Sequence, residues 1–274
     1  MSCTKSRLSL RLQRGLQQEQ RGSAVAAGAN CSISVTFIPT ATGTRTGAIT
    51  ISDNASDSPQ MVNLTGTGTS GGVPGTIGFV QARGNGTNAT TNTVLINTTA
   101  SNDVIVVVAF ATTTPRVTSV SDTGGSTYTL IAAVNKGSGA RVEKWAAHRA
   151  AASTAITVNL SALAKSRVEV AEYSGVVTLG LTALKTGSGA SLSIALTTQS
   201  ANSWVVAGFA EKNSTSFSPS IGNLRDSGSF TISGTTVGGA VNDNTAANPL
   251  SVTNAVTTNA TGLWAAAALE LPLS

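Results

Sequence analysis

The chain has 274 residues, of which only 11% are charged and 4% aromatic, whereas about 25% of the residues in an average soluble domain are charged. Its abundant Thr, Ser, Gly, Val and Asn favour strands and tight turns and argue against a helical protein. Of the net charge of +5, the first 22 residues carry +4, so the remainder is almost neutral and a nucleic-acid partner is not expected.

Residues 1–22, MSCTKSRLSLRLQRGLQQEQRG, form a basic N-terminal tail. Leu8, Leu10 and Leu12 alternate as in a short strand, but Gly15 interrupts the helix-forming residues around it, so disorder is expected for most of this tail. Its composition differs abruptly from that of the rest, so a misassigned reading frame or start codon is an alternative explanation.

Only two cysteines are present, Cys3 and Cys31. Two cysteines, one of them in the tail, do not make the disulfide framework of a small secreted scaffold, so a Cys3–Cys31 bridge is not expected. No run of about 18 apolar residues predicts a membrane span, and no secretory signal peptide is recognisable. If the protein is exported, we expect its signal to lie outside this chain or the chain to be a piece of a longer protein.

Strand-forming alternation begins after the tail and predicts a small β unit over residues 23–68. Apolar side chains alternate there with Ser and Thr, which is typical of half-buried antiparallel strands. In the last strand, Val62 and Leu64 are expected to point inward. The expected strands are residues 32–38, 45–52 and 60–65.

A Gly/Pro/Ser-rich stretch, TSGGVPGT at residues 69–76, predicts a linker to a longer β pattern over residues 77–274. Twelve short segments separated by Gly, Ser, Asn and Thr turns predict an antiparallel β-sandwich of jelly-roll type. Three segments are apolar on both faces and predict central strands, covered on both sides: 103–111, 203–210 and 263–271. The others are 77–82, 92–97, 117–122, 126–134, 140–148, 155–160, 167–173, 192–198 and 229–241.

Two resemblances extend this prediction. Residues 28–69 contain G-A-N-C, V-T-F-x-P-T, T-G-x-R-x-G, I-x-D-N-A and L-x-G-x-G-T in succession. This segment resembles the C-terminal half of a bacterial choice-of-anchor D or ASH-type immunoglobulin-like repeat. In that family the cysteine that matches Cys31 often has a partner some ten residues upstream, where this chain has none. The resemblance implies a partial immunoglobulin-like unit whose opening strands are missing. Its apolar face or edge must then dock on the sandwich, recruit the tail or stay poorly ordered.

The second resemblance covers residues 77–273. It rests on V-S-D-T-G-G-S-T-Y-T-L (120–130), V-E-K-W-A-A-H (142–148) and V-A-E-Y-S-G-V (170–176). These motifs are similar to those of a jelly-roll module in large secreted bacterial surface proteins. The resemblance implies an extracellular or cell-surface location and neighbouring domains in a longer chain, without implying a chemistry.

Catalysis is not expected. The chain has one histidine, His148, at the end of a strand and without a nucleophile motif, and a zinc site lacks ligands. Glu169 and Glu172 are the nearest pair of carboxylates for glycoside hydrolysis. Because they are three residues apart on a strand, they should point to opposite faces. We expect Glu172, beside Tyr173, to bind a loop backbone and fix a corner.

Calcium is a weak alternative cofactor, because secreted β-sandwiches often bind it with Asp and Asn in turns. Asp53 and Asp57 fall in one expected turn, and Asp243, between Asn242 and Asn244, in another. Neither stretch has the spacing of a calcium loop, and such residues favour turns in their own right. No cofactor is therefore expected.

A sugar-binding surface needs an exposed aromatic face. By alternation Trp145 shares a strand face with Arg141 and Glu143, so these three residues are the candidate ligand-binding site. Trp204 and Trp264 lie in doubly apolar segments and are expected in the core. Tyr128 and Tyr173 are expected at corners or rims, with backbone partners for their hydroxyls.

Two functions remain open from the sequence. The first is a non-catalytic structural or adhesive module of an extracellular or cell-surface protein. The second is a carbohydrate-binding module of a secreted carbohydrate-active protein. The expected partners are glycans or other surface proteins, and an exposed platform at Trp145 would separate the two functions.

Overall fold

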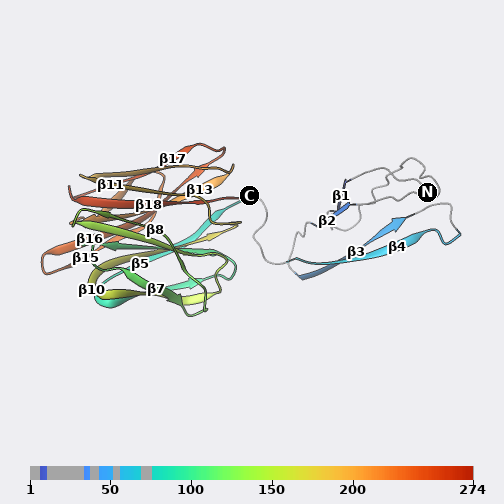
Figure 1. The fold of residues 1–274 in the computed structure, drawn as a ribbon, viewed down its shortest axis with the longest axis horizontal. Helices are drawn as coiled ribbons and strands as arrows, with labels where there is room; N and C mark the ends of the chain where they lie inside the picture. Colours follow the sequence, from blue (N-terminus) through green and yellow to red (C-terminus); the bar gives the residue numbers. More distant parts are fainter. Residues whose placement is uncertain (1–6, 11–33, 38–42, 52–55, 69–75, 274) are drawn as a thin grey trace. The chain divides into compact units, whose positions relative to one another are not determined.

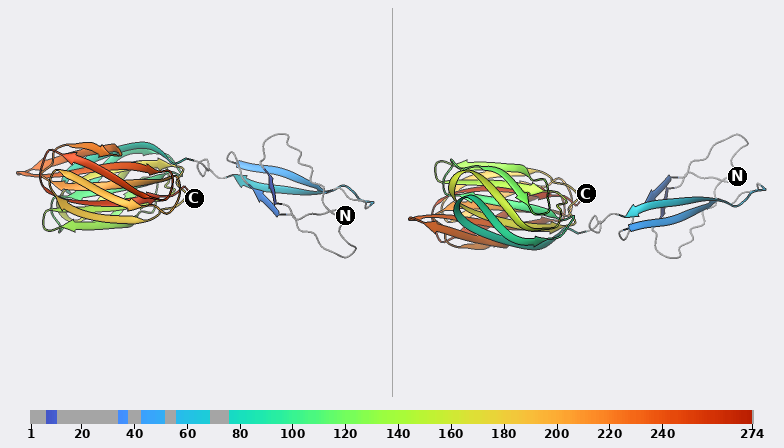
Figure 2. Two further views of the ribbon diagram at one scale, coloured as in Figure 1. Left: turned by 90° about the horizontal axis from the view of Figure 1, so that it is seen from above. Right: turned by 90° about the horizontal axis from the view of Figure 1, so that it is seen from below.

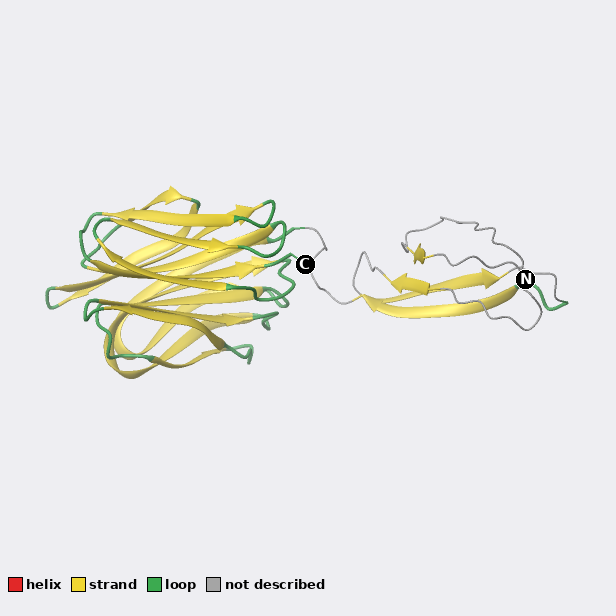
Figure 3. Ribbon diagram, turned by 45° about the horizontal axis from the view of Figure 1, so that its top comes forward, coloured by secondary structure: helices red, strands yellow, loops and turns green. Residues whose placement is uncertain are grey.

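The computed structural model of the protein describes residues 7–10, 34–37, 43–51, 56–68 and 76–273. The chain divides into two compact units, residues 1–70 and 71–274. This division falls inside the stretch that the sequence predicts as a linker. All regular structure in the described ranges is β, which confirms the predicted all-β class (Figure 3).

The first unit has four strands within the described residues. β1 (Arg7–Leu10) pairs in parallel with β2 (Ser34–Phe37), so a short part of the tail is recruited as a strand, and β3 (Gly43–Ile51) pairs antiparallel with β4 (Gln60–Gly68). Val62 is 47% exposed and Met61 is 65% exposed. The expectation that Val62 points inward is therefore wrong, because no described layer covers that side of the β3–β4 hairpin. The opening segment around Cys31 lies outside the described residues.

The second unit contains fourteen strands in its described part, arranged in three antiparallel sheets (Figure 1). The first sheet has the order β5-β10-β6-β9-β8. Strand β7 pairs with residues 156–160 of β10, outside the part of β10 that pairs with β6. The other two sheets have the orders β11-β18-β13-β16-β15 and β12-β17-β14. The strands are β5 (Gly78–Thr98), β6 (Asp103–Phe110), β7 (Val117–Asp122), β8 (Thr129–Lys136), β9 (Ala140–Ala147), β10 (Ser153–Ser174), β11 (Thr182–Ser188), β12 (Ser191–Thr197), β13 (Ser203–Lys212), β14 (Phe217–Ile221), β15 (Asn223–Ile232), β16 (Thr235–Ala246), β17 (Ser251–Thr258) and β18 (Leu263–Leu271).

The second unit is built from two halves with the same strand order. The first half uses two long strands, β5 and β10, whose pairing shifts register between Asn159 and Ala164. In the second half each long strand is replaced by two, β11 with β12 and β17 with β18, with Gly189 at φ +102 in the first break. When each pair of short strands is counted as one long strand, the order β11-β18-β13-β16-β15 matches β5-β10-β6-β9-β8 element for element. The order β12-β17-β14 matches β5-β10-β7 in the same way. The unit is an internal structural duplication.

Three apolar interfaces hold the strands in layers. The central one joins the two halves and includes Val107 and Ala171 of the first and Val206 and Val241 of the second. One outer interface lies within the first half and includes residues of β5, β6, β7 and β10. The other lies between the sheet β12-β17-β14 and the sheet that contains β13. Seen from above, strands of the second half lie in front, and seen from below, those of the first half do (Figure 2).

The predicted central strands are confirmed. Every residue of β6 is buried, and β6, β13 and β18 each have a neighbour on both sides. Segment 229–241 is not one strand, because Ser233 and Gly234, both at positive φ, turn β15 into β16. Segments 77–82 and 92–97 belong to one strand, β5, and segments 155–160 and 167–173 belong to β10. The alternation alone did not predict β11, β14 and β17.

Candidate functional site

The loops before the central strands β6 and β13 are each held by a buried glutamate. Glu172 Oε1 accepts hydrogen bonds from the Thr99 amide and the Asn102 side chain, both at 2.7 Å. Gln81 Nε2 donates to its other oxygen at 2.7 Å. Glu172 thus fixes a corner through a loop backbone, as the sequence predicts.

Glu270 has the same role in the second half. Its Oε1 accepts from the amides of Gln199 and Ser200 at 2.9 and 3.2 Å and from Ser203 Oγ at 3.0 Å. Glu172 pairs with Val104 and Glu270 with Val205, at matching places in the two sheets. The two carboxylates therefore fix equivalent loops.

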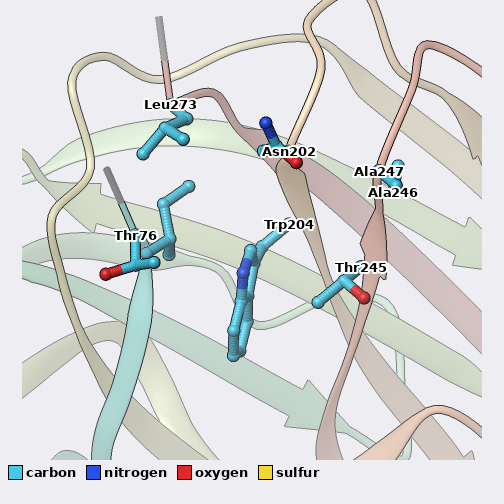
Figure 4. A pocket seen from close by; sticks show the side chains of 8 residues that line it. Thr76, Asn202, Trp204, Thr245, Ala246, Ala247 and Leu273 are labelled. Carbon is cyan, nitrogen blue, oxygen red and sulfur yellow. The ribbon is translucent and has the colours of Figure 1, made fainter. Parts of the chain in front are cut away.

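The loop that Glu270 fixes carries Asn202 at the rim of a hollow. Asn202 has a φ of +55° and its amide donates to the Ala247 carbonyl at 3.2 Å. The hollow has a volume of about 330 Å³ and includes Trp204 in its wall, near the lower end of the range for small-molecule sites. Figure 4 shows the Trp204 ring between Thr76 on one side and Thr245 on the other, with Asn202 above it in the view. The lining residues are Thr76, Ile77, Asn202, Trp204, Thr245, Ala246, Ala247 and Leu273.

The Trp204 ring is supported from within by aromatic and cationic neighbours. The Tyr173 ring meets it edge-on at 6.0 Å between centroids, and the Arg225 guanidinium lies 5.7 Å from its centroid. Arg225 also lies 4.2 Å from the centroid of Phe79. Because edge-on aromatic and cation–π contacts are directional, they fix the plane of the indole.

Asp243 is the anion at the base of this cluster. Its Oδ2 accepts from Arg225 Nε at 2.6 Å and from Tyr173 Oη at 2.9 Å, and Asn223 Nδ2 reaches its Oδ1 at 3.3 Å. Burial, with the neighbouring Asp243 carboxylate, raises the pKa of Tyr173 well above its usual value. The prediction that Asp243 lies in a turn is wrong, because Asp243 is fully buried in strand β16. Its hydrogen bonds with Arg225, Tyr173 and Asn223 explain why a charged residue stands there.

At the equivalent place in the first half, Asp103 is hydrogen-bonded to His148. Trp204 pairs with Leu271 of β18, and Asp103 pairs with Tyr173 of β10. Trp204 and Asp103 therefore hold equivalent positions in the two halves. Asp103 is buried and bonds His148 Nδ1 at 2.9 Å and the Arg149 amide at 3.0 Å. Burial raises the pKa of Asp103, although these two hydrogen bonds oppose the rise. His148 is an exposed residue directly after β9, as expected, and it lies opposite Asp103 as Thr245 lies opposite Trp204 in the second half.

The predicted ligand-binding residues Trp145, Arg141 and Glu143 do lie together, but they do not form an exposed platform. Arg141 and Glu143 are 7% and 1% exposed. Glu143 accepts from Arg141 Nε at 2.8 Å, from Trp145 Nε1 at 3.3 Å and from the Val117 amide at 3.2 Å. Strand β7, which begins at Val117, therefore covers the face that alternation assigns to solvent.

Glu169 and Glu172 point to opposite faces of β10, as predicted. Glu169 faces the central interface, where Arg167 donates to it at 2.6 and 3.1 Å. Burial raises the pKa of Glu169 well above its usual value, against the opposing effect of Arg167. Arg167 also lies 3.9 Å from Asp226 of the other half. This cluster ties the halves together by ion pairs.

Lys144 is a fully buried cation in the central interface. Its Nζ donates to the carbonyl of Val206 in the opposite half. Burial lowers its pKa to about 7, because the charged form loses its hydration there. Lys144 is therefore a second polar link between the halves.

Of the weak calcium candidates, Asp53 lies outside the described residues. Asp57 is exposed and accepts from Gln60 at 3.0 Å. Within the described ranges no group of three or more His, Cys, Asp or Glu side chains is placed to hold a metal ion. The same ranges contain no helix long and apolar enough to cross a membrane.

The remaining aromatic predictions are partly wrong. Trp264 is 4% exposed and lies in the core, as expected. Trp204 is only partly buried, because it is the second residue of its strand and its ring stands at the rim. Tyr128 and Tyr173 are buried and donate to the side chains of Asp122 and Asp243 rather than to backbone groups. The signal in the sequence for the hollow is the place of Trp204 at the start of its strand, two residues after the turn residue Asn202.

Comparison of the chain with protein-family models, with curated proteins and with solved structures gave no match.

Proposed function

We propose that this protein is a non-catalytic structural or adhesive module of an extracellular or cell-surface protein. Its second unit displays a rigid β block, and its first unit is the closing part of an immunoglobulin-like repeat of the choice-of-anchor D or ASH type. Other surface proteins or glycans are its partners, and neighbouring domains belong to the same longer chain.

The duplicated glutamate clamp is the observation that carries this proposal. Glu172 and Glu270 are buried at equivalent positions, and each accepts hydrogen bonds from a loop of its own half. The buried carboxylates of Glu143, Glu169 and Asp243 likewise bind neighbouring arginines. Buried charges used in this way favour one rigid arrangement over chemistry on a substrate.

The surface chemistry supports an extracellular location. Only 11% of the residues are charged, and the outward positions of β12 include Ser191 and Thr197, whose hydroxyls hydrate without ion pairs. A carbohydrate-binding role centred on Trp145 is not supported, because its neighbours Arg141 and Glu143 are buried.

Antibodies raised against the full chain test the location directly. Intact, unpermeabilised cells of the source organism and their culture medium should be labelled, and permeabilisation should add little signal. A cytoplasmic protein probed in parallel controls for leakage. Labelling that appears only after permeabilisation would refute the proposal.

A further inference from the structure

We propose that the hollow at Trp204 is a binding site for a neutral sugar ring, with the indole as the stacking platform. This goes beyond the structural role, and it moves sugar recognition from Trp145 to a residue that the sequence pattern assigns to the core. The site lies at the rim of the second half, between the beginning of β5 and the end of β18.

The platform is fixed before any ligand arrives. Tyr173 and Arg225 hold the Trp204 ring, and Asp243 holds both of them. A side chain locked in this way loses little conformational entropy on binding, so more of the contact energy contributes to affinity. A pyranose has an apolar face of C–H groups that matches the flat, apolar face of an indole.

A polar side chain that suits sugar hydroxyls lies at the rim of the platform. Asn202 offers a side-chain amide with both donors and an acceptor, and no hydrogen bond joins it to another described side chain. Thr76 and Thr245 flank the indole, with their hydroxyl oxygens turned away from the ring (Figure 4). None of the eight lining residues is charged, and Arg225 behind the ring is already paired with Asp243. The chemistry therefore fits an uncharged polyhydroxylated ligand better than a uronic acid or a sulfated sugar.

The duplication provides an internal comparison. Where the first half has Asp103 paired with His148, the second half has Trp204 beside Thr245. The two halves share the glutamate clamp and the strand order but differ at this place. Two equivalent rim positions, Asp103 and Trp204 together with His148 and Thr245, thus carry different side chains in the two halves, as a site present in only one half requires.

Saturation-transfer NMR on the full chain tests the proposal with defined probes. The probes are the methyl glycosides of glucose, galactose, mannose and N-acetylglucosamine, together with glucuronic acid as an anionic comparison. Affinity electrophoresis in gels containing xylan, β-glucan or galactomannan extends the test to polymers. We expect at least one neutral probe to bind, and glucuronic acid to bind more weakly than glucose.

Tryptophan variants locate the binding. Trp204→Ala should weaken it by about tenfold or more, the effect of losing a central aromatic contact. Asn202→Ala, at an exposed turn, should weaken it several-fold without unfolding the protein. Trp264→Phe and Trp145→Phe are matched controls that should leave binding unchanged.

Two outcomes overturn the proposal. One is the absence of binding to every neutral probe at concentrations that saturate weak lectins. The other is binding that survives both Trp204→Ala and Asn202→Ala. Either result leaves the structural role untouched, because that role is tested by cell-surface labelling.

Discussion

A methyl group on Gly208 would lie 2.6 Å from both γ-carbons of Val107 in the opposite half. Such a distance is shorter than real side chains tolerate, so the central interface requires glycine at this point of β13. The two halves approach here as closely as their backbones and the Val107 side chain allow.

Gly208→Ala should therefore lower the free energy of unfolding of the second unit by about 1–3 kcal/mol through overpacking. Val107→Ala in the same chain should recover part of that loss, so that the two changes cost less together than in sum by about 0.5 kcal/mol or more. Urea denaturation followed by tryptophan fluorescence measures this, since all three tryptophans lie in the second unit. Strict additivity would show that the halves are not in contact at this point.

Loss of a glutamate clamp should destabilise its own half. Glu270→Ala leaves the loop amides of Gln199 and Ser200 without their acceptor, and hydrogen bonds to charged groups are worth about 1.5–3 kcal/mol each. We expect a loss of about 3 kcal/mol or more, and the same for Glu172→Ala. Glu172→Gln, which keeps an acceptor for Thr99 and Asn102, should cost clearly less. Equal losses for the Ala and Gln variants would contradict the role of these hydrogen bonds.

Lys144 should make the stability of the second unit rise with pH. Its pKa in the folded protein is about 7, below the value of about 10.4 for an unfolded lysine. Between these values the unfolded chain binds more protons, so stability increases with pH, by at most about 1.4 kcal/mol per unit. Below about pH 7 both states are protonated and this contribution becomes constant.

Lys144→Met should abolish most of that rise. Denaturation at several pH values between about 7.5 and 9.5 measures it, a window chosen below the titration of unfolded tyrosine at about 10. Lys185→Met, at an exposed position, is the control and should keep the wild-type slope. A wild-type slope in Lys144→Met would mean that Lys144 stays charged in the fold.

The Asp243 cluster should show graded losses. Tyr173→Phe removes one hydrogen bond to Asp243 and should cost about 1–2 kcal/mol. Asp243→Ala leaves the Arg225 guanidinium and the Tyr173 hydroxyl without their acceptor and should cost about 3–5 kcal/mol. Guanidinium chloride titration compares the two, and a larger loss for Tyr173→Phe than for Asp243→Ala would contradict this account.

The sequence predicts those features of the fold and site that depend on neighbouring residues in the chain, and it misses those that depend on residues distant in sequence. β6 is apolar on both faces, and its central place follows from that run alone. The orientation of Glu172 opposite Glu169 follows from the two-residue period of a strand. Trp145 obeys the same period, but β7, an element distant in the sequence, covers its face, and no local pattern reveals that. Asn242, Asp243 and Asn244 resemble a turn because the partners of Asp243, Tyr173 and Arg225, are distant in sequence.

Thr76 and Leu273 line the same hollow, so the first and last described residues of the second unit are neighbours. Tension applied along the chain would act across these adjacent ends, and would peel β5 and β18 from their neighbours one hydrogen bond at a time.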